Sequence, residues 1–225
     1  MKSRELDIHG GIQYSPSKDS YMQKAAFVCA LALVVLSSCV GIDSDLSVRE
    51  NGSGTLDLTY RVSQLIVNLG NPTDGKSVVP LPLSRSDFER SVQATQGKVR
   101  LTRFDRSEDQ KDITIRAGLA FDSLDALSQM DAFQNAQIRL GADGGAHTFS
   151  ELIAKAPPEP LTDDSLKMVD AFFGGYDLTF RIEAPKPITT NNLGTLSADK
   201  RVLTYKTTIG DIVRTKNDIV LSMSW

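Results

Sequence analysis

Two side chains with the chemistry of a hydrolase lie three residues apart in the chain, His147 and Ser150. A serine nucleophile needs a base to remove its proton, and His147 is the one histidine that follows the N-terminal apolar segment. Residues three apart on a strand point to opposite faces, so the two side chains would not meet locally. The Gly-x-Ser-x-Gly pattern is absent. The spacing therefore favours a surface histidine beside a turn over a catalytic base.

Acidic side chains gather at two places, and neither has the spacing of a metal site. The sequence Asp-x-Asp/Asn-x-Asp/Asn-Gly of a calcium loop is missing, and a zinc site needs more His and Cys ligands than this chain offers. We therefore expect no metal and no other cofactor. We interpret one group as a solvated hairpin tip and the other as acids in the first turn of a helix. The groups are Asp105, Glu108, Asp109 and Asp112, and Asp163 with Asp164.

Two further stretches could bind anions. Gly141–Gly145 is rich in glycine but lacks the Lys-Ser/Thr and the following helix of a phosphate loop, so it predicts a turn. The densest positive run could face anionic lipid head groups, although the solvated face of a strand explains it more simply. This run consists of Lys98, Arg100, Arg103 and Arg106.

The N-terminal part of the chain contains a short apolar run that begins directly after Lys24. Ala25–Leu36 is twelve residues long, which as a helix covers roughly 18 Å. This is well short of the ~30 Å hydrocarbon core of a bilayer. A short apolar run behind a positive charge is typical of a secretory signal peptide.

The end of this run, Leu36-Ser37-Ser38-Cys39, resembles the lipobox of bacterial lipoproteins. The resemblance implies cleavage between Ser38 and Cys39, a diacylglycerol group on the Cys39 sulfur, and an acyl chain such as palmitate on its amine. Serine before the cysteine is tolerated in the relaxed lipoboxes of spirochaetes. We therefore expect a signal peptide over residues 1–38, with Met22 as a candidate true start. The alternative is a buried core helix with an incidental cysteine.

A lipid on Cys39 would decide where the protein works. One acyl chain holds a protein reversibly and two or more hold it stably, at roughly 0.8 kcal/mol for each buried CH₂. We expect a lipid-anchored protein of the bacterial cell envelope, on its periplasmic or its surface-facing side. Residues 39–48 would form the lipidated N-terminus and a short tether, or Gly41–Val48 would begin the first strand. Residues 49–225 would form a single domain.

Composition limits the classes of function that are open to residues 39–225, the predicted mature part of the chain. The chain carries a formal charge of −3, and its first 38 residues hold four Lys/Arg and three Asp/Glu, so the rest carries −4. A mildly acidic domain argues against nucleic acid as a partner. Because Cys29 leaves with the signal peptide and Cys39 takes the lipid, no cysteine remains for a disulfide.

Hydrophobic periodicity alternates between strand pairs and single helices. Turn residues at Glu50–Gly54 predict a hairpin, and Ile113–Phe121 alternates cleanly as a strand. Helices are expected to begin at Ser86, Asp122 and Thr162, and the last to end at Gly174. This order predicts an α+β fold, with an antiparallel sheet built from hairpins and about three helices packed on one face. The other expected strands are Lys98–Arg106, Gln137–Leu140, His147–Ile153, Tyr176–Glu183, Val202–Thr207 and Asp218–Trp225.

The chain also resembles bacterial lipoproteins of the LppM type, including treponemal members. The lipobox, the strand–turn–strand segment Asp45–Tyr60, and the late segment Phe180–Tyr205 carry this resemblance. It implies an envelope lipoprotein whose α+β domain holds a lipid or glycolipid, and it supplies no catalytic motif.

We therefore expect a non-catalytic domain that binds an amphiphile or a protein partner. The predicted ligand cleft lies between the sheet and the helix Leu161–Phe173, although core packing would also explain the apolar residues of that helix. Two other functions stay open, a phospholipase-like lipid hydrolase and a surface adhesin. The residues assigned to the cleft are Leu166, Val169, Phe172 and Phe173.

Overall fold

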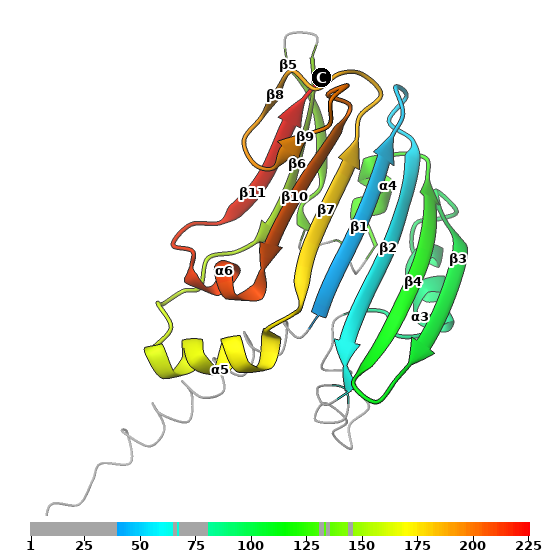
Figure 1. Cartoon of the computed structure of the whole chain (residues 1–225). Coiled ribbons are helices and arrows are strands. Elements are labelled where there is room, and N and C mark those ends of the chain that lie inside the picture. Colours follow the sequence, from blue (N-terminus) through cyan, green and yellow to red (C-terminus); the bar gives the residue numbers. More distant parts are fainter. Residues whose placement is uncertain (1–39, 65–66, 68–80, 131–132, 134–135, 144–145) are drawn as a thin grey trace, which may run out of the picture. The chain divides into compact units, whose positions relative to one another are not determined.

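The fold is taken from a computed structural model that describes residues 40–64, 67, 81–130, 133, 136–143 and 146–225. The predicted signal peptide, the predicted cleavage site after Ser38 and Cys39, the residue predicted to be lipidated, lie outside the described residues, as does most of the expected loop Gly70–Leu83. The described part consists of strands in two sheets and four short helices (Figure 1). The α+β class and the mainly antiparallel pairing are confirmed.

The larger sheet has seven strands in the order β3-β4-β2-β1-β7-β10-β9. Neighbours in this sheet are antiparallel, except that β1 and β7 run parallel. Parallel neighbours require a crossover connection, and here most of the chain separates the two strands. The strands are β1 Val40–Val48, β2 Gly54–Ser63, β3 Val99–Glu108, β4 Asp112–Phe121, β7 Asp177–Glu183, β9 Thr195–Leu196 and β10 Val202–Thr208.

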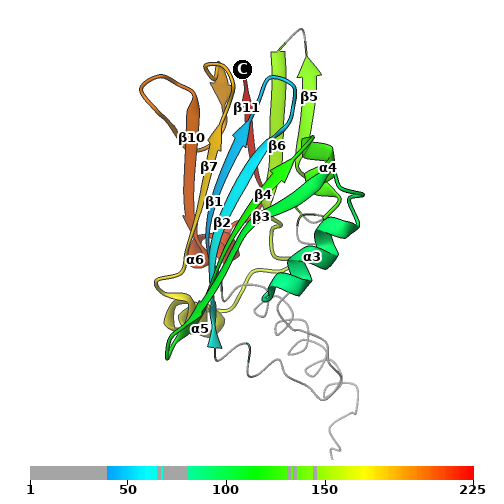
Figure 2. The ribbon, with the colours of Figure 1, turned by 90° about the vertical axis from the view of Figure 1, so that its right-hand side faces the viewer.

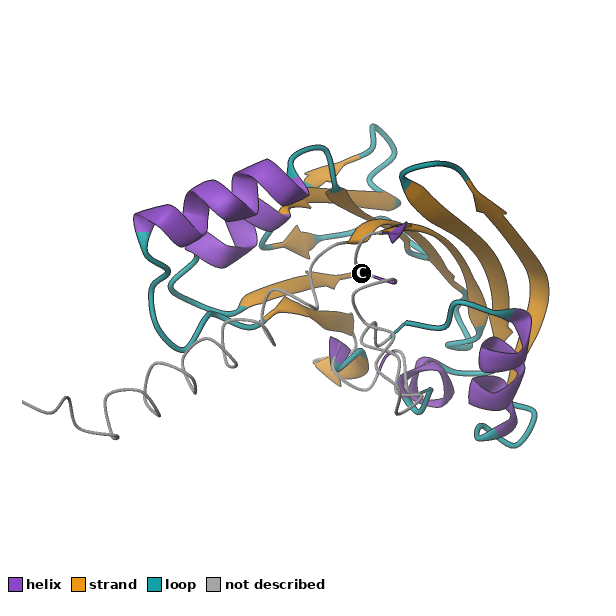
Figure 3. Ribbon diagram, turned by 90° about the horizontal axis from the view of Figure 1, so that it is seen from below, coloured by secondary structure: helices purple, strands orange, loops and turns teal. Residues whose placement is uncertain are grey.

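A second sheet of four strands has the order β5-β6-β11-β8. It lies over one face of the larger sheet, on the side of β7 and β10 (Figures 1 and 3). The sequence predicted one sheet, because a strand pattern does not state which sheet a strand joins. The strands are β5 Arg139–Asp143, β6 Ala146–Ala154, β8 Thr190–Asn191 and β11 Ile219–Ser224.

The helices occupy two places. Helices α3 and α4 cover the same face of the larger sheet as the second sheet does, on the side of β3 and β4 (Figure 2). Helices α5 and α6 lie at the end of the sheet where β7 begins (Figure 1). The bounds are α3 Arg85–Gln93, α4 Leu124–Ser128, α5 Asp163–Phe173 and α6 Ile209–Arg214.

One hydrophobic core joins these layers. Ile182 and Leu203 of the larger sheet are buried together with Phe149 and Leu221 of the second sheet. Leu127 of α4 belongs to the same cluster. Because the described domain has no disulfide to support it, burial of this apolar surface, at roughly 25 cal/mol per Å², is its main source of stability.

The first hairpin is confirmed, and its first strand is longer than predicted. Strand β1 begins at Val40 and pairs with β2 along its whole length, from Val40 opposite Val62 to Val48 opposite Gly54. Gly52 takes a φ of 79°, the left-handed conformation that a tight turn needs. Residues 40–48 therefore form a strand of the sheet.

Helix ends show where local signals are ambiguous. Helix α3 is capped by Ser84, whose Oγ accepts from the Asp87 backbone N–H, and not by Ser86. Helix α4 is capped by Ser123, whose side chain accepts from the Ala126 backbone N–H, and not by Asp122. The cap at Thr162 is confirmed. Helix α6 was not predicted, because its six residues are too few to show a helical period.

Candidate functional site

The α5 end of the domain, which comprises the first residues of β1 and β7 together with α5, includes the residue that follows Cys39 in the sequence. Strand β1 begins at Val40, the residue that follows Cys39. A side-chain carbon built at Gly41 would lie 3.5 Å from the Asp177 backbone oxygen and 3.5 Å from the Tyr176 ring. Val40 and Gly41, the two residues that follow Cys39 in the sequence, therefore lie at the α5 end.

The four residues of the predicted cleft lie on helix α5 in two different environments, buried and exposed. Val169 and Phe173 are buried in the core, and Leu166 packs partly against it. Phe172 is 60% exposed. Helix α5 lies across the end of the sheet (Figures 1 and 3), and the two buried side chains fit the core-packing interpretation of this helix.

A buried hydrogen bond lies at the α5 end. The Tyr176 hydroxyl donates to the Asp112 carboxylate at 2.5 Å. Burial, followed by this hydrogen bond and the charge of Asp112, raises the pKa of Tyr176 to about 12. The Arg61 guanidinium lies 5.6 Å from the centre of the Tyr176 ring and the Lys111 ammonium 5.1 Å from it. These two cations offset the negative charge of the Asp112 carboxylate, which the Tyr176 hydroxyl contacts.

Three of the four acids in the cluster around Asp112 are exposed as predicted, and the fourth is not. Asp105, Glu108 and Asp109 are exposed at or near the β3–β4 turn, as predicted for a hairpin tip. Asp109 accepts from the backbone N–H groups of Lys111 and Asp112, each at 2.8 Å, and these bonds lower the pKa of Asp109. Asp112, in contrast, is buried. Among the residues that the structure describes, no group of three or more His, Cys, Asp or Glu is arranged to hold a metal ion.

The basic run lies on the exposed edge strand β3 and in the loop before it. Three of its arginines pair with acids: Arg100 with Asp122 at 3.5 Å, Arg103 with Asp57 at 3.2 Å, and Arg106 with Glu108. Lys98 is exposed. Charged side chains on an edge strand also hinder pairing with another chain. The arrangement favours a solvated strand face over a site for anionic head groups.

His147 and Ser150 lie on β6 and do not form a catalytic pair. The His147 ring stacks on Trp225, with ring centres 5.9 Å apart, and its backbone N–H and carbonyl both bond to Trp225. No hydrogen bond joins His147 to Ser150 among the contacts of the described residues. These contacts of His147 hold Trp225 against β6.

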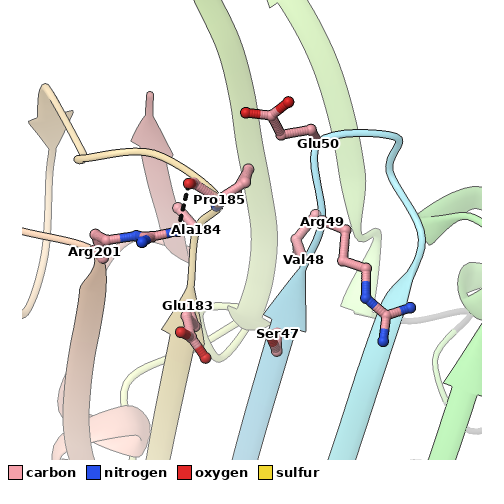
Figure 4. Close-up of a pocket in the computed structure, with 8 residues that line it drawn as sticks. All are labelled: Ser47, Val48, Arg49, Glu50, Glu183, Ala184, Pro185 and Arg201. Atoms are coloured by element: carbon pink, nitrogen blue, oxygen red, sulfur yellow. Dashed lines mark hydrogen bonds between the residues drawn. The ribbon is translucent and has the colours of Figure 1, made fainter.

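A polar depression of about 370 Å³ lies at the opposite end of β1 and β7. These strands separate after Ser47, which pairs with Glu183, and the depression lies between their ends (Figure 4). Arg201 reaches the β7 side of the depression from the start of β10 and donates to the Pro185 carbonyl at 2.6 Å (Figure 4). No local sequence pattern indicates this site, because it depends on the parallel pairing of two distant strands. Its lining is Ser47, Val48, Arg49, Glu50, Glu183, Ala184, Pro185 and Arg201.

Glu151 is an isolated acid on the inner face of the second sheet. It lies two residues from buried Phe149 on β6, and alternate residues of a strand share a face. Although part of Glu151 is exposed, desolvation raises its pKa from 4.5 to about 7. The Glu151 carboxyl group therefore changes between its neutral and its charged form near physiological pH.

Comparisons with known proteins give a distant structural likeness. The chain matches no protein-family model, and no curated protein matches it. Its fold is similar to the solved folded domain of LppM from Mycobacterium tuberculosis, with a TM-score of 0.47 and 11% sequence identity. The match covers 84% of this chain and 90% of that one. At this level of similarity the likeness concerns the fold and carries no conclusion about function.

Proposed function

We propose that this protein is a lipid-anchored lipoprotein of the bacterial cell envelope. The observation that carries the proposal is Leu36-Ser37-Ser38-Cys39 at the end of a short apolar run, one residue before a folded strand begins at Val40. Diacylglycerol on the Cys39 sulfur would supply two chains, enough for stable attachment. Within the described ranges, no helix combines the length and the apolar character needed to span a bilayer.

The domain itself serves binding rather than catalysis in this proposal. The one histidine of the predicted mature chain, His147, stacks on Trp225, and no hydrogen bond among the described residues joins it to Ser150. The ligand would be a lipid, a glycolipid or a protein partner. In a lipid-binding role the cleft beneath α5 would open only if Val169 and Phe173 left the core.

Metabolic labelling with a radioactive or clickable fatty acid in a bacterial host tests the anchor. We expect the full chain to incorporate label and to fractionate with membranes, and Cys39→Ser to lose both properties. Cys29→Ser is the matched control, because Cys29 lies within the predicted signal peptide and should not affect labelling. A mature N-terminus other than Cys39, found by mass spectrometry, would contradict the proposal.

Native mass spectrometry of the protein released from membranes tests the binding role. A bound lipid would support the binding module, and an empty domain would favour interaction with proteins. Esterase activity that is lost in His147→Ala would instead favour the hydrolase. Proteolysis of intact cells would separate a surface-displayed adhesin from a protein that faces the periplasm.

A further inference from the structure

Helix α5 exposes two large apolar side chains side by side. Met168 is 53% and Phe172 is 60% exposed, and residues four apart are neighbours on the surface of a helix. Among the described residues, Val220 is the third large apolar side chain with comparable exposure. Two of the three therefore lie on this one helix, on a side that no described part of the domain covers.

The position of this apolar pair relative to Cys39 indicates what covers it. Phe172 lies four residues before Tyr176, whose ring lies against the position of Gly41. Cys39 is two residues before Gly41, and β1 is fixed on both sides by β2 and β7. A lipid on Cys39 would therefore be attached one residue before a strand that is paired from Val40 onward. A bilayer that takes its acyl chains would lie next to the α5 end.

We propose that the α5 end rests on the bilayer that holds the lipid of Cys39, with Met168 and Phe172 inserted into its interface. This inference rests on the proposed lipid anchor. Apolar side chains of a helix that lies on a membrane enter the boundary between head groups and acyl chains. The opposite end of the domain, with the depression between β1 and β7, then faces away from the membrane.

The charges on α5 indicate that this contact is apolar rather than electrostatic. Lys167 pairs with Asp164 at 3.1 Å, and Asp170 pairs with Arg214 of α6 at 2.7 Å. Paired charges leave little net attraction for anionic lipid. The part of the contact that α5 makes should therefore depend weakly on anionic lipid and on salt, since screening acts mainly on unpaired surface charges.

Site-directed fluorescence tests this orientation in the full chain, because the predicted mature protein has no cysteine other than Cys39. Phe172→Cys and Met168→Cys variants are produced in a host that processes lipoproteins, labelled with an environment-sensitive thiol dye, and reconstituted into phosphatidylcholine vesicles. Quencher groups are attached to the lipid acyl chains. Ala198→Cys is the matched control, because Ala198 is exposed in the turn before β10, at the far end of β7. Mass spectrometry of the N-terminal peptide reports acylation of Cys39 in the same samples.

We expect the dye at positions 168 and 172 to be quenched severalfold more strongly than at position 198, with little change when phosphatidylglycerol or salt is added. Equal quenching at all three positions on an acylated protein would overturn the orientation and leave the anchor standing. A bright dye at position 172 that lipid-borne quenchers do not reach would indicate contact with a protein, such as a second copy, and would also overturn it. An unmodified Cys39 would overturn both proposals.

Discussion

Tyr176 and Asp112, 64 residues apart, form a buried hydrogen bond of 2.5 Å at the α5 end. Asp112 is the first residue of β4, and Tyr176 immediately precedes β7. The bond thus ties together two strands that are separated by β2 and β1 in the sheet. It fixes the beginning of β7, and with it the chain that leaves α5.

Removal of the Tyr176 hydroxyl should destabilise the domain. Tyr176→Phe leaves the buried Asp112 carboxylate without this donor, which costs about 1–3 kcal/mol of unfolding free energy. Tyr205→Phe is the control, because the Tyr205 ring stacks on Phe180, with centres 6.5 Å apart, and its hydroxyl makes no hydrogen bond among the described residues. Urea denaturation of both variants measures the difference. Equal losses would show that the hydroxyl of Tyr176 contributes nothing specific.

Glu151 should make stability depend on pH. Its folded pKa of about 7 lies above its ordinary value of 4.5, so the folded state holds a proton that the unfolded state releases. The resulting stability is complete below about 4.5 and is lost as the pH rises to about 7. Glu151→Gln should abolish this decline and, above the window, be more stable than the parent by ~1–3 kcal/mol. Denaturation on both sides of the window, with exposed Glu159→Gln as control, checks it.

The start of β2 accepts only glycine. A side-chain carbon at Gly54 would collide with the Ser47 carbonyl and would lie 2.5 Å from the Phe121 ring. Gly54→Ala should therefore lower the unfolding free energy by ~1–3 kcal/mol, as expected for overpacking. At Gly41 the nearest atom would be 3.4 Å away, so Gly41→Ala is the matched control and should cost less. Similar melting temperatures for the two variants would contradict this account.

The ion pair between α5 and α6 should hold α5 in place. Arg214 donates two hydrogen bonds to Asp170, at 2.9 and 2.7 Å. Asp170→Asn weakens this bidentate pair, and because both side chains are about half exposed, the global loss should be only ~0.5 kcal/mol. The larger effect should be faster hydrogen exchange in α5. Asp164→Asn, at the exposed pair with Lys167, should leave exchange in most of the helix unchanged.

Local signals in the sequence predicted most of the elements. The alternation of Ile113–Phe121 became β4, and the turn residues between β1 and β2 formed the predicted hairpin. Thr162 capped α5, which ended before Gly174 as expected. These signals work because strand periodicity, turn conformation and capping are decided by residues close together in the chain.

Other features depended on competing local signals. Ser84 and Ser86 both precede the same acidic stretch, and Ser84 caps α3 because its side chain and Asp87 bond reciprocally. Residues 40–48 carry too few large apolar side chains to predict that β1 would be a central strand. Its place in the sheet comes from backbone pairing with β2 and β7 on both edges.

The sequence by itself determined the chemistry predicted for Cys39, because the lipobox and the apolar run before it are contiguous residues. It also determined the α+β class, through the alternation of strand and helix patterns. Only the tertiary structure decided that β1 pairs in parallel with β7 and that the strands divide into two sheets. It likewise placed α5, with Met168 and Phe172, beside the residue that follows the predicted anchor. The pairing of β1 with β7 and the position of α5 join residues more than a hundred positions apart, and such contacts depend on packing that no local pattern encodes.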